Sequence, residues 1–245
     1  MAEPQLAGQT VVVLGGSAGI GLATARRARA EGANVVITGR DPERLARAAA
    51  DVGATQTAHF DAADEPALQQ FFDQLGQQLD GPIGHVLVAA GGPYYAPFAE
   101  LDVADAMRYV SRTLALPLNV ARFAAPRMGP GGSLTFIGGT GARRPGKGLS
   151  IIGAVSAAAP ALVANLALEV APVRVNLVAP GFVDTPLSAT LLGTGLEARR
   201  EELRRSLPVR RVTEPSDVAA LAVHLMVNPV LTGATYDIDG GQQLL

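Results

Sequence analysis

A glycine-rich segment near residue 15 has the residue types and spacing of a phosphate-binding loop. Val11–Leu14 is a short β-branched run that leads straight into the glycines and then into an expected helix. Gly15 permits a tight turn, Gly19 lets the backbone approach phosphate groups, and Gly21 lets helix and strand pack closely. The helix N-terminus adds free N–H groups and the positive end of the helix dipole. The segment therefore predicts a site for the pyrophosphate of a dinucleotide.

Strand-like and helix-like patterns alternate along the chain and would position this loop. The expected strands are short apolar runs bounded by turn residues: Val11–Leu14, Asn34–Thr38, His85–Ala89, Ser133–Ile137 and Arg174–Val178, with two less apolar candidates, Thr55–Phe60 and Thr235–Ile238. The expected helices between them are Gly21–Glu31, Pro42–Asp51, Glu65–Leu79, Ala104–Met128, Ile151–Val170 and Pro215–Val227. This alternation predicts an α/β fold: a Rossmann-type, doubly wound, mostly parallel sheet of about seven strands flanked by helices, with ligands beyond the carboxyl ends of the strands.

The composition favours one large globular domain. No stretch rich in Pro, Gly or Ser divides the 245 residues, so we expect a single domain over residues 1–245. With 48% hydrophobic and 17% charged residues, the chain can bury a large core. The net charge of −2 gives no electrostatic footprint for nucleic acid, and the absence of cysteine excludes disulfides and thiolate metal sites.

The sequence carries no recognisable targeting signal. Met1–Leu6 lacks a basic region followed by an apolar stretch, so no signal peptide is expected. The apolar runs look short and interrupted, which predicts that none spans a bilayer. We therefore expect a cytoplasmic protein with neither membrane nor nucleic-acid partners.

The glycine spacing G-x-x-x-G-x-G resembles that of the classical short-chain dehydrogenase/reductase family. Four further elements resemble motifs of the same family, and together they extend the resemblance from Leu14 to Gly241: Phe60-Asp61-Ala62, Leu87–Gly92, Val178–Pro186 and Asp239-Gly240-Gly241. The resemblance implies a nicotinamide cofactor, a small-molecule substrate and a homodimer or homotetramer.

The end of the second expected strand indicates which nicotinamide cofactor is used. In the family this position usually carries an acidic residue when NAD is bound, because the acid binds the adenosine ribose. Here Gly39 leaves room for a 2′-phosphate, and the guanidinium of Arg40 is suited to bind it, with Ser17 as a further donor. The preferred cofactor is therefore NADP(H). Alternatively, Arg40 is a solvated loop residue in front of a helix that begins at Asp41-Pro42.

The remaining cofactor contacts follow from the resemblance. It implies that Asp61 binds the adenine amino group, although a plain helix cap explains this residue equally well. Ala89 and Ala90 replace the two asparagines of the family's L-V-N-N-A-G element. The full set of expected cofactor-binding residues is Gly15, Ser17, Ala18, Gly19, Ile20, Gly21, Arg40, Asp61, Ala62, Ala90, Gly91, Gly92, Pro180, Gly181, Val183 and Thr185.

The catalytic positions of the family carry other residues in this chain. The resemblance assigns proton transfer to a tyrosine, a lysine four residues later, a serine on the preceding strand and an asparagine in an earlier helix. Counting back from Glu169–Pro172 places Ile152 in the tyrosine position and Ser156 in the lysine position. Gly139 stands where the serine is expected, and Thr113 stands where the asparagine is expected.

No tyrosine in the sequence is followed four residues later by lysine. The tyrosines are Tyr94, Tyr95, Tyr109 and Tyr236, and the one lysine is Lys147. Isoleucine cannot donate a proton and serine cannot supply the charge of lysine, so the family's usual mechanism is absent as written. General acid–base catalysis contributes about 10²–10⁴-fold, so hydride transfer to an activated alkene or iminium ion, which needs less acid help than a ketone, remains open.

Replacement proton donors are few. Tyr94 and Tyr95 lie in a loop expected near the nicotinamide, where they either reach a substrate or pack the loop. Weaker candidates in the same region are Thr140, Lys147, Ser150 and Ser156. The three histidines, His59, His85 and His224, are far apart in sequence and are interpreted as surface or core residues, so no metal site is predicted.

The resemblance implies that residues 187–214 form a lid over the substrate. Glu197–Arg205 is a charged amphipathic helix within it, and its charges either form a solvated face or include an arginine that recognises an acidic substrate. The expected helix Ile151–Val170 carries seven alanines, which permit close approach of a second subunit or pack inward on the sheet: Ala154, Ala157, Ala158, Ala159, Ala161, Ala164 and Ala167.

Three functional hypotheses follow. The first is an NADP(H)-dependent oxidoreductase with a diverged active site that acts on a small carbonyl, enone or imine. The second is a non-catalytic NADP(H)-binding sensor or scaffold. The third is a non-redox enzyme that reuses the cleft.

Overall fold

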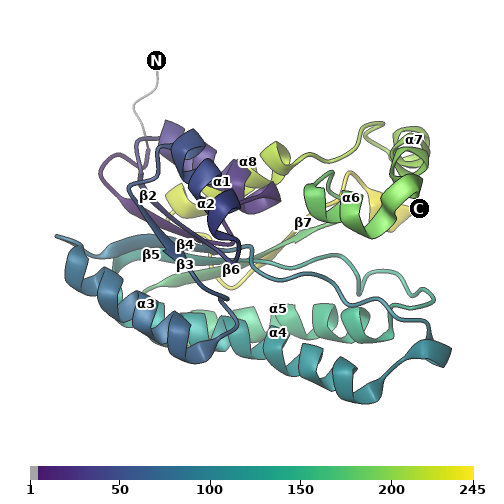
Figure 1. Ribbon diagram of the computed structural model, residues 1–245, viewed down its shortest axis with the longest axis horizontal. Helices are drawn as coiled ribbons and strands as arrows, with labels where there is room; N and C mark the ends of the chain where they lie inside the picture. Colours follow the sequence, from purple (N-terminus) through teal and green to yellow (C-terminus); the bar gives the residue numbers. More distant parts are fainter. Residues whose placement is uncertain (1–4) are drawn as a thin grey trace.

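A single seven-stranded sheet forms the centre of the computed structural model, which describes residues 5–245 (Figure 1). The strand order is β3-β2-β1-β4-β5-β6-β7, and every neighbouring pair is parallel. The strands are β1 (Thr10–Leu14), β2 (Asn34–Gly39), β3 (Gln56–His59), β4 (Ile83–Val88), β5 (Met128–Ile137), β6 (Arg174–Pro180) and β7 (Thr235–Ile238). Every residue of β1 and β6 is buried, as expected when helices cover both faces of a parallel sheet. The predicted fold class is confirmed.

Two layers of helices enclose the sheet (Figure 1). The helices α1 (Gly19–Ala30), α2 (Pro42–Val52) and α8 (Pro215–Val227) cover one face, and their apolar residues pack with β1 and β2. The helices α3 (Glu65–Gln78), α4 (Val103–Ala124) and α5 (Ser150–Glu169) cover the other face and pack with the central strands. The short helix α6 (Pro186–Leu192) and the helix α7 (Leu196–Ser206) follow β6 and lie together at one end of the sheet.

The order of the strands places the site. From β1 the chain moves outward to β2 and β3, and it then returns across β1 to form β4 on the other side. The carboxyl ends of β1 and β4 therefore flank the point at which the strand order reverses. Ligands of doubly wound sheets bind at such a point because the loops that follow the two strands diverge there.

Several expected boundaries are wrong. The predicted strand Ser133–Ile137 begins too late, because β5 starts at Met128, and the predicted strand Arg174–Val178 ends too early, because β6 ends at Pro180. The predicted helix Ala104–Met128 is too long, because α4 ends at Ala124 and a 3-10 turn containing Pro126 separates it from Met128, the first residue of β5. Proline has no N–H to continue a helical ladder, which favours a break at this point. The predicted strand His85–Ala89 begins earlier, at Ile83, and Ala89 lies beyond its end.

The expectation that no apolar segment could span a bilayer also needs correction. By length and composition alone, α5 is long and apolar enough, and only 17% of its most apolar window is buried. The many alanines of α5 raise its mean hydropathy, although each of them adds only a small apolar side chain. The length of the apolar run in this helix was therefore underestimated. A single helix of this kind is weak evidence for a membrane span, and α5 packs on β6 and α4 through Val155, Val163 and Leu166.

Candidate functional site

The glycine-rich loop between β1 and α1 is held by close backbone contacts. Gly15 has a positive φ of 85°, and a Cβ atom there would lie 2.7 Å from the carbonyl oxygen of Ala89. A Cβ atom on Gly21 would lie 2.2 Å from the carbonyl oxygen of Gly15. Both positions therefore require glycine, for the reasons that the sequence indicated: a turn at Gly15 and close helix–strand packing at Gly21.

The N-terminus of α1 has no side-chain cap. Its N-cap residue is Ala18, and its first turn contains no acidic residue. Side-chain oxygens of Asp41, Asp64, Asp102 and Thr185 cap α2, α3, α4 and α6, whereas α5 and α7, like α1, begin without one. The first N–H groups of α1 are thus left for an anion, and the helix dipole favours negative charge there.

The end of β2 brings two of the predicted nucleotide contacts, Ser17 and Arg40, to either side of Gly39. A Cβ atom on Gly39 would lie 2.9 Å from Oγ of Ser17, so the Ser17 hydroxyl occupies the space that an acidic side chain would need. Arg40 follows, and its side chain is exposed and has no ion-pair partner among residues 5–245. The carbonyl oxygen of Arg40 lies 2.7 Å from Nε2 of His59 on β3, which fixes the backbone at this position.

Asp61 is not the cap of a helix. The N-cap of α3 is Asp64, whose side chain accepts a hydrogen bond from the Ala67 N–H. Asp61 instead accepts from the Ala63 N–H, and its other carboxylate oxygen lies 2.9 Å from the guanidinium of Arg112 on α4. This ion pair joins residues 51 positions apart, and no spacing pattern predicts it. Ala62, the next predicted contact, is buried in the core.

The segment that follows β6, which is predicted to contact the nicotinamide, is hydrogen-bonded to the C-terminal part of the chain. The Gly181 N–H donates to the carbonyl oxygen of Ile238, and the Phe182 N–H donates to Oε1 of Gln242. A Cβ atom on Gly181 would lie 2.7 Å from Cβ of Asp239, which belongs to the Asp-Gly-Gly element. Val183 is buried, and Thr185 caps α6 through the N–H of Ser188.

A chain of contacts links the loops at the carboxyl ends of the strands. The methyl carbon of Thr185 lies 3.4 Å from a Cβ atom built on Gly19, and Cδ1 of Leu187 lies 3.9 Å from one built on Gly92. The loop after Gly92 continues this chain, because the Ala96 N–H donates to the carbonyl oxygen of Gly148, just before α5. The predicted contacts of β1, β4 and β6 therefore surround one region, in which Gly91 has a positive φ and Ala90 packs against the core.

Three of the four positions that the resemblance assigned to catalysis, Gly139, Ile152 and Ser156, lie in or against the loop that follows β5. A Cβ atom on Gly141 would lie 3.3 Å from Oγ of Ser156 and 3.7 Å from Cγ1 of Ile152, so both side chains face the loop that follows β5. Gly139 lies in that loop, next to the carbonyl oxygen of Pro180. Thr113 is on α4 and donates its hydroxyl to the carbonyl oxygen of Tyr109.

The loop that follows β5 is fastened to β7 by an ion pair. Arg143 donates two hydrogen bonds to the carboxylate of Asp237, at 3.1 and 2.9 Å. The Thr140 N–H donates to the carbonyl oxygen of Pro180, which is a backbone role. The other weak candidates in this region, Lys147 and Ser150, are exposed.

Three of the four tyrosines gather beside this region. The rings of Tyr94 and Tyr109 lie 5.3 Å apart between centroids, at an interplanar angle of 31°. Burial raises the pKa of the Tyr95 phenol and also that of the Tyr109 phenol. Sequence reasoning missed Tyr109, although its i,i+4 spacing from Thr113 places both residues on one helix face and was the available signal.

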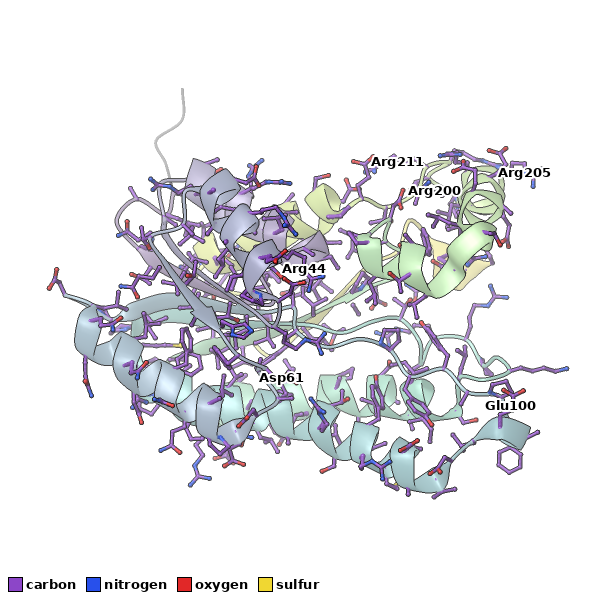
Figure 2. All side chains as sticks on the ribbon, viewed as in Figure 1. Arg44, Asp61, Glu100, Arg200, Arg205 and Arg211 are labelled. Atoms are coloured by element: carbon purple, nitrogen blue, oxygen red, sulfur yellow. The ribbon has the colours of Figure 1, made fainter. Side chains whose placement is uncertain are left out.

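The charged helix α7 pairs largely with itself. Arg199 contacts Glu202, Arg200 contacts Glu197, and Arg204 contacts Glu197 and Glu201. Arg200 also donates to Asp184 at 2.8 Å, which ties α7 to the segment before α6 and raises the pKa of the Arg200 guanidinium. Figure 2 labels Arg200, Arg205 and Arg211 around α7 and the segment that follows it. The predicted solvated, self-paired face is present, although the helical pairs have i,i+3 rather than i,i+4 spacing.

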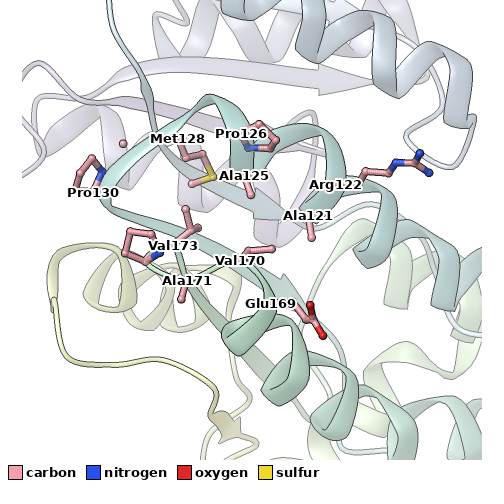
Figure 3. A pocket seen from close by; sticks show the side chains of 12 residues that line it. Ala121, Arg122, Ala125, Pro126, Met128, Pro130, Glu169, Val170, Ala171 and Val173 are labelled. Atoms are coloured by element: carbon pink, nitrogen blue, oxygen red, sulfur yellow. The ribbon is translucent and has the colours of Figure 1, made fainter.

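Polar residues and two cavities also lie at the other side of the sheet, near the amino ends of the strands. Buried His85 lies 2.8 Å from Oγ of Ser133 and 2.9 Å from Oε1 of Gln9. Buried Arg174 donates to four backbone carbonyl oxygens, two of them near the C-terminus of α8. A cavity of about 820 Å³ adjoins these residues, and one of about 390 Å³ lies between the ends of α4 and α5 (Figure 3). Neither is lined by a predicted cofactor or catalytic residue.

The part of the chain that the structure describes contains no cluster of side chains suited to bind a metal ion. No group of three or more His, Asp or Glu side chains there could hold a metal ion. His224 is exposed near the end of α8, and His59 and His85 have the separate contacts given above.

Comparisons with known proteins cover nearly the whole chain. A family model described as enoyl-(acyl carrier protein) reductase matches residues 15–243. An NADP-dependent (R)-specific alcohol dehydrogenase from Lentilactobacillus kefiri is 33% identical, over 97% of this chain and 97% of that protein. The short-chain dehydrogenase/reductase malC from Malbranchea aurantiaca is 29% identical, over 98% of this chain and 96% of that protein.

Solved structures agree with these matches. The MalC reductase/Diels–Alderase from Malbranchea aurantiaca superimposes with a TM-score of 0.90, covering 99% of both chains at 29% identity. A crystal structure of BdcA in complex with NADPH superimposes with a TM-score of 0.84, covering 96% of this chain and 95% of that one at 29% identity.

Proposed function

Because the chain belongs to the short-chain dehydrogenase/reductase family, we propose that it is an NADP(H)-dependent oxidoreductase with a diverged active site. It transfers hydride between NADP(H) and a small organic carbonyl, enone or imine. The observation that carries the cofactor choice is the end of β2, where the Ser17 hydroxyl fills the space beside Gly39 and Arg40 is unpaired among the described residues. An acid at position 39 would have to displace the Ser17 hydroxyl, whereas a 2′-phosphate finds a hydroxyl and a guanidinium there.

Two relatives support this choice of cofactor. The Lentilactobacillus kefiri enzyme is described as NADP-dependent, and BdcA was crystallised with NADPH. Both align with this chain over nearly its full length, so the nucleotide-binding segment lies within the compared region.

The residues of this chain fit such a cofactor. The uncapped N-terminus of α1 and the backbone around Gly19 would hold the pyrophosphate, and Asp61 would meet the adenine. Pro180–Val183 would meet the nicotinamide amide, and Thr185 would meet the pyrophosphate. When bound, the nicotinamide supplies or accepts the hydride.

The diverged positions narrow the chemistry. Ile152 and Ser156 face Gly141, where the family places its tyrosine and lysine, and neither can provide a proton at physiological pH. Positioning alone can supply roughly 7–11 kcal/mol of a reaction barrier. Electrophiles that need little acid help, such as enones and iminium ions, are therefore the preferred substrates.

A second candidate is an NADP(H)-binding sensor or scaffold without turnover. The replacement of tyrosine and lysine by Ile152 and Ser156 favours it, because the cofactor contacts do not depend on these two side chains. An oxidoreductase must consume NADPH with some electrophile, whereas a sensor needs only to bind it.

The decisive experiment measures NADPH and NADH affinity for the wild type and for Arg40→Ala. Loss of a charge-assisted phosphate contact should weaken NADPH binding by about 1.5–3 kcal/mol and leave NADH binding unchanged. Arg47→Ala is the matched control, because Arg47 is an exposed arginine on α2 that pairs with Glu43. Equal affinity of the wild type for both cofactors would overturn the choice of NADP(H). NADPH oxidation with a panel of enones, imines and ketones then separates the reductase from the sensor.

We also propose that a second copy of the chain covers the outer surface of α5. Ala154, Ala157, Ala161 and Ala164 are exposed on this helix, and Leu168 is 79% exposed at its end. Small side chains permit close helix–helix approach. Sedimentation should give a dimer or tetramer at micromolar concentration, and Ala161→Arg should shift it toward monomer. A wild type that sediments only as a monomer would contradict this proposal.

A further inference from the structure

His59, the last residue of β3, lies against the segment that the proposed function assigns to cofactor selection. In the parallel pair of β2 and β3, Gly39 is the register partner of His59. The Phe60 N–H donates to the carbonyl oxygen of Gly39 at 3.2 Å, and Nε2 of His59 lies 2.7 Å from the carbonyl oxygen of Arg40. One backbone donor and one side-chain donor from the end of β3 thus hold two successive carbonyl groups at the end of β2.

The contact with Arg40 defines where the hydrogen lies on the His59 ring. A carbonyl oxygen only accepts hydrogen bonds, so Nε2 of His59 must carry a hydrogen and donate it. In the neutral ring Nδ1 is then the nitrogen without a hydrogen, and a proton added at Nδ1 leaves the Nε2–H in place. The hydrogen bond to Arg40 is therefore present in both charge states of His59.

The two hydrogen bonds set the direction in which the Arg40 side chain leaves the backbone. A peptide group is planar, so a hydrogen bond to its carbonyl oxygen orients the whole plane. The planes before and after the Cα atom of Arg40 contain the Gly39 and Arg40 carbonyl groups, and both carbonyl oxygens accept from the end of β3. With both planes held, the backbone dihedrals of Arg40 and the direction of its Cα–Cβ bond are fixed.

Arg40 is held through its backbone and not through its side chain. The side chain is exposed and has no ion-pair partner among residues 5–245. The next residue, Asp41, is committed to α2, because its carboxylate caps that helix. On the other side, Oγ of Ser17 lies 2.9 Å from a Cβ atom built on Gly39. A hydroxyl and a guanidinium thus start from adjacent points, and both can donate to one phosphate group.

We propose that His59 is a positioning residue that contributes to selectivity for NADP(H). Its Nε2–H holds the peptide plane that follows Arg40, so the guanidinium is directed toward the 2′-phosphate before the cofactor arrives. NADH has no 2′-phosphate, so its binding gains nothing from this hydrogen bond. The inference rests on the proposed choice of NADP(H), and it gives a role to a histidine that the sequence indicated only as a surface or core residue.

The position of the ring hydrogen provides the first test. The chain has three histidines, so ¹⁵N NMR can resolve their ring nitrogens, and loss of one set of signals in His59→Gln assigns those of His59. At alkaline pH, where the ring is neutral, His59 should carry its hydrogen on Nε2. A hydrogen on Nδ1 would overturn the inference, because Nε2 could then not donate to Arg40.

Calorimetric titration with NADPH and NADH provides the second test. His59→Leu removes the donor and should weaken NADPH binding about 10-fold, the size expected when the backbone of one residue must be ordered on binding. The affinity of this variant for NADH and its thermal midpoint should remain those of the wild type, because His59 is exposed. His59→Gln offers an amide N–H in place of Nε2–H and should keep the wild-type affinity for NADPH. His224→Leu is the matched control, because His224 is an exposed histidine on α8.

A double variant separates this inference from the proposed function. In an Arg40→Ala background, His59→Leu should not weaken NADPH binding further, because no guanidinium is left to position. A loss that persists there, an equal loss for NADPH and NADH, unchanged NADPH affinity in His59→Leu, or a His59→Gln variant as weak as His59→Leu would each overturn the role of His59. A wild type that prefers NADPH keeps the proposed cofactor in all these cases. If the wild type binds both cofactors equally, the choice of NADP(H) is wrong and the role of His59 falls with it.

Discussion

The two ends of the strands differ in whether the protein satisfies their polar groups. We call the side with the amino ends the amino edge and the side with the carboxyl ends the carboxyl edge. At the amino edge, both ring nitrogens of His85 have protein partners, and Arg174 donates to four backbone carbonyl oxygens. At the carboxyl edge, α1 begins without a side-chain cap and Arg40 has no ion-pair partner among residues 5–245. Donors without partners, rather than empty volume, distinguish the carboxyl edge, because the cavity of about 820 Å³ lies at the amino edge.

Each edge depends on a different kind of group. The carboxyl edge is built from backbone that passes close to other backbone, as at Gly15 and Gly21, so it tolerates no side chain at these positions. The amino edge is built from side chains that satisfy one another, so its weak point is a change of protonation.

The largest effect is expected from Gly21→Ala, which attacks the backbone packing of the carboxyl edge. The new Cβ atom would lie 2.2 Å from the carbonyl oxygen of Gly15, so the strand or the helix must move. We expect a loss of about 3 kcal/mol in the free energy of unfolding and a loss of NADPH binding. Urea denaturation measures the first and fluorescence titration the second. Gly81→Ala is the control, because a Cβ atom there meets nothing within 4 Å; equal stability of the two variants would contradict the prediction.

Lowering the pH should destabilise the folded protein through the amino edge. Burial, and then the positive charge of Arg174, lower the pKa of His85 from 6.5 to about 4. The unfolded chain therefore binds an extra proton between these values, and the stability of the neutral ring is present above pH 6.5 and lost as pH falls to about 4. The loss should reach about 3 kcal/mol in the free energy of unfolding.

His85→Gln removes this titration while it keeps hydrogen-bonding capacity. Urea denaturation at a series of pH values should show a flatter profile between pH 6.5 and 4 for His85→Gln than for the wild type. His224→Gln changes an exposed histidine and should leave the wild-type slope. Parallel profiles for the wild type and His85→Gln would mean that His85 is not the responsible group.

Restoring the family's acid tests whether the carboxyl edge still accepts it. The double variant Ile152→Tyr with Ser156→Lys places a phenol and an ammonium group beside Gly141. We expect NADPH-dependent reduction of a saturated ketone, such as cyclohexanone, to rise about 10–100-fold. No rise with intact NADPH binding would mean that the pocket has been rebuilt for another substrate.

The smallest effect is expected from Arg112→Ala, which breaks the ion pair with Asp61. Both side chains are largely in contact with water, at 60% and 40% exposure, so solvent screens their attraction. We expect a change of at most about 1 kcal/mol in the free energy of unfolding, similar to that of Arg108→Ala, which breaks the pair with Asp105 one turn earlier. A change several times larger for Arg112→Ala would give Asp61 a structural role beyond the cofactor.

The sequence was informative where local chemistry decides the structure. β-Branched runs predicted the buried strands, and the glycine spacing predicted the loop, because the backbone conformation at Gly15 excludes other residues. The predicted end of α4 was wrong because the apolar pattern continues past Ala124. Proline was no clear stop signal either, because it also stands inside helices of this protein, at Pro117 within α4 and at Pro160 within α5.

Contacts between residues that are far apart in the sequence could not be predicted from it. The pair Arg112–Asp61 and the pair Arg143–Asp237 join surface charges that have many alternative partners in the sequence. The stack of Tyr94 on Tyr109 depends on the path of the loop after β4, which has no periodic pattern. In contrast, Ile152 and Ser156 both face Gly141 because they lie one turn apart on a helix whose period the sequence shows.

The contact between Phe182 and Gln242 has a consequence for the time at which the protein becomes active during its synthesis. Gln242 accepts the Phe182 N–H, and the two residues are 60 positions apart. At 5–20 residues per second, a ribosome needs roughly 3–12 s to make the intervening chain. During that interval the nascent protein can already contain the completed strands β1, β4 and β5. The segment after β6, however, still lacks the C-terminal residues that it contacts in the folded protein, such as Gln242. Cofactor capture should therefore come late in translation, after most of the sheet has formed.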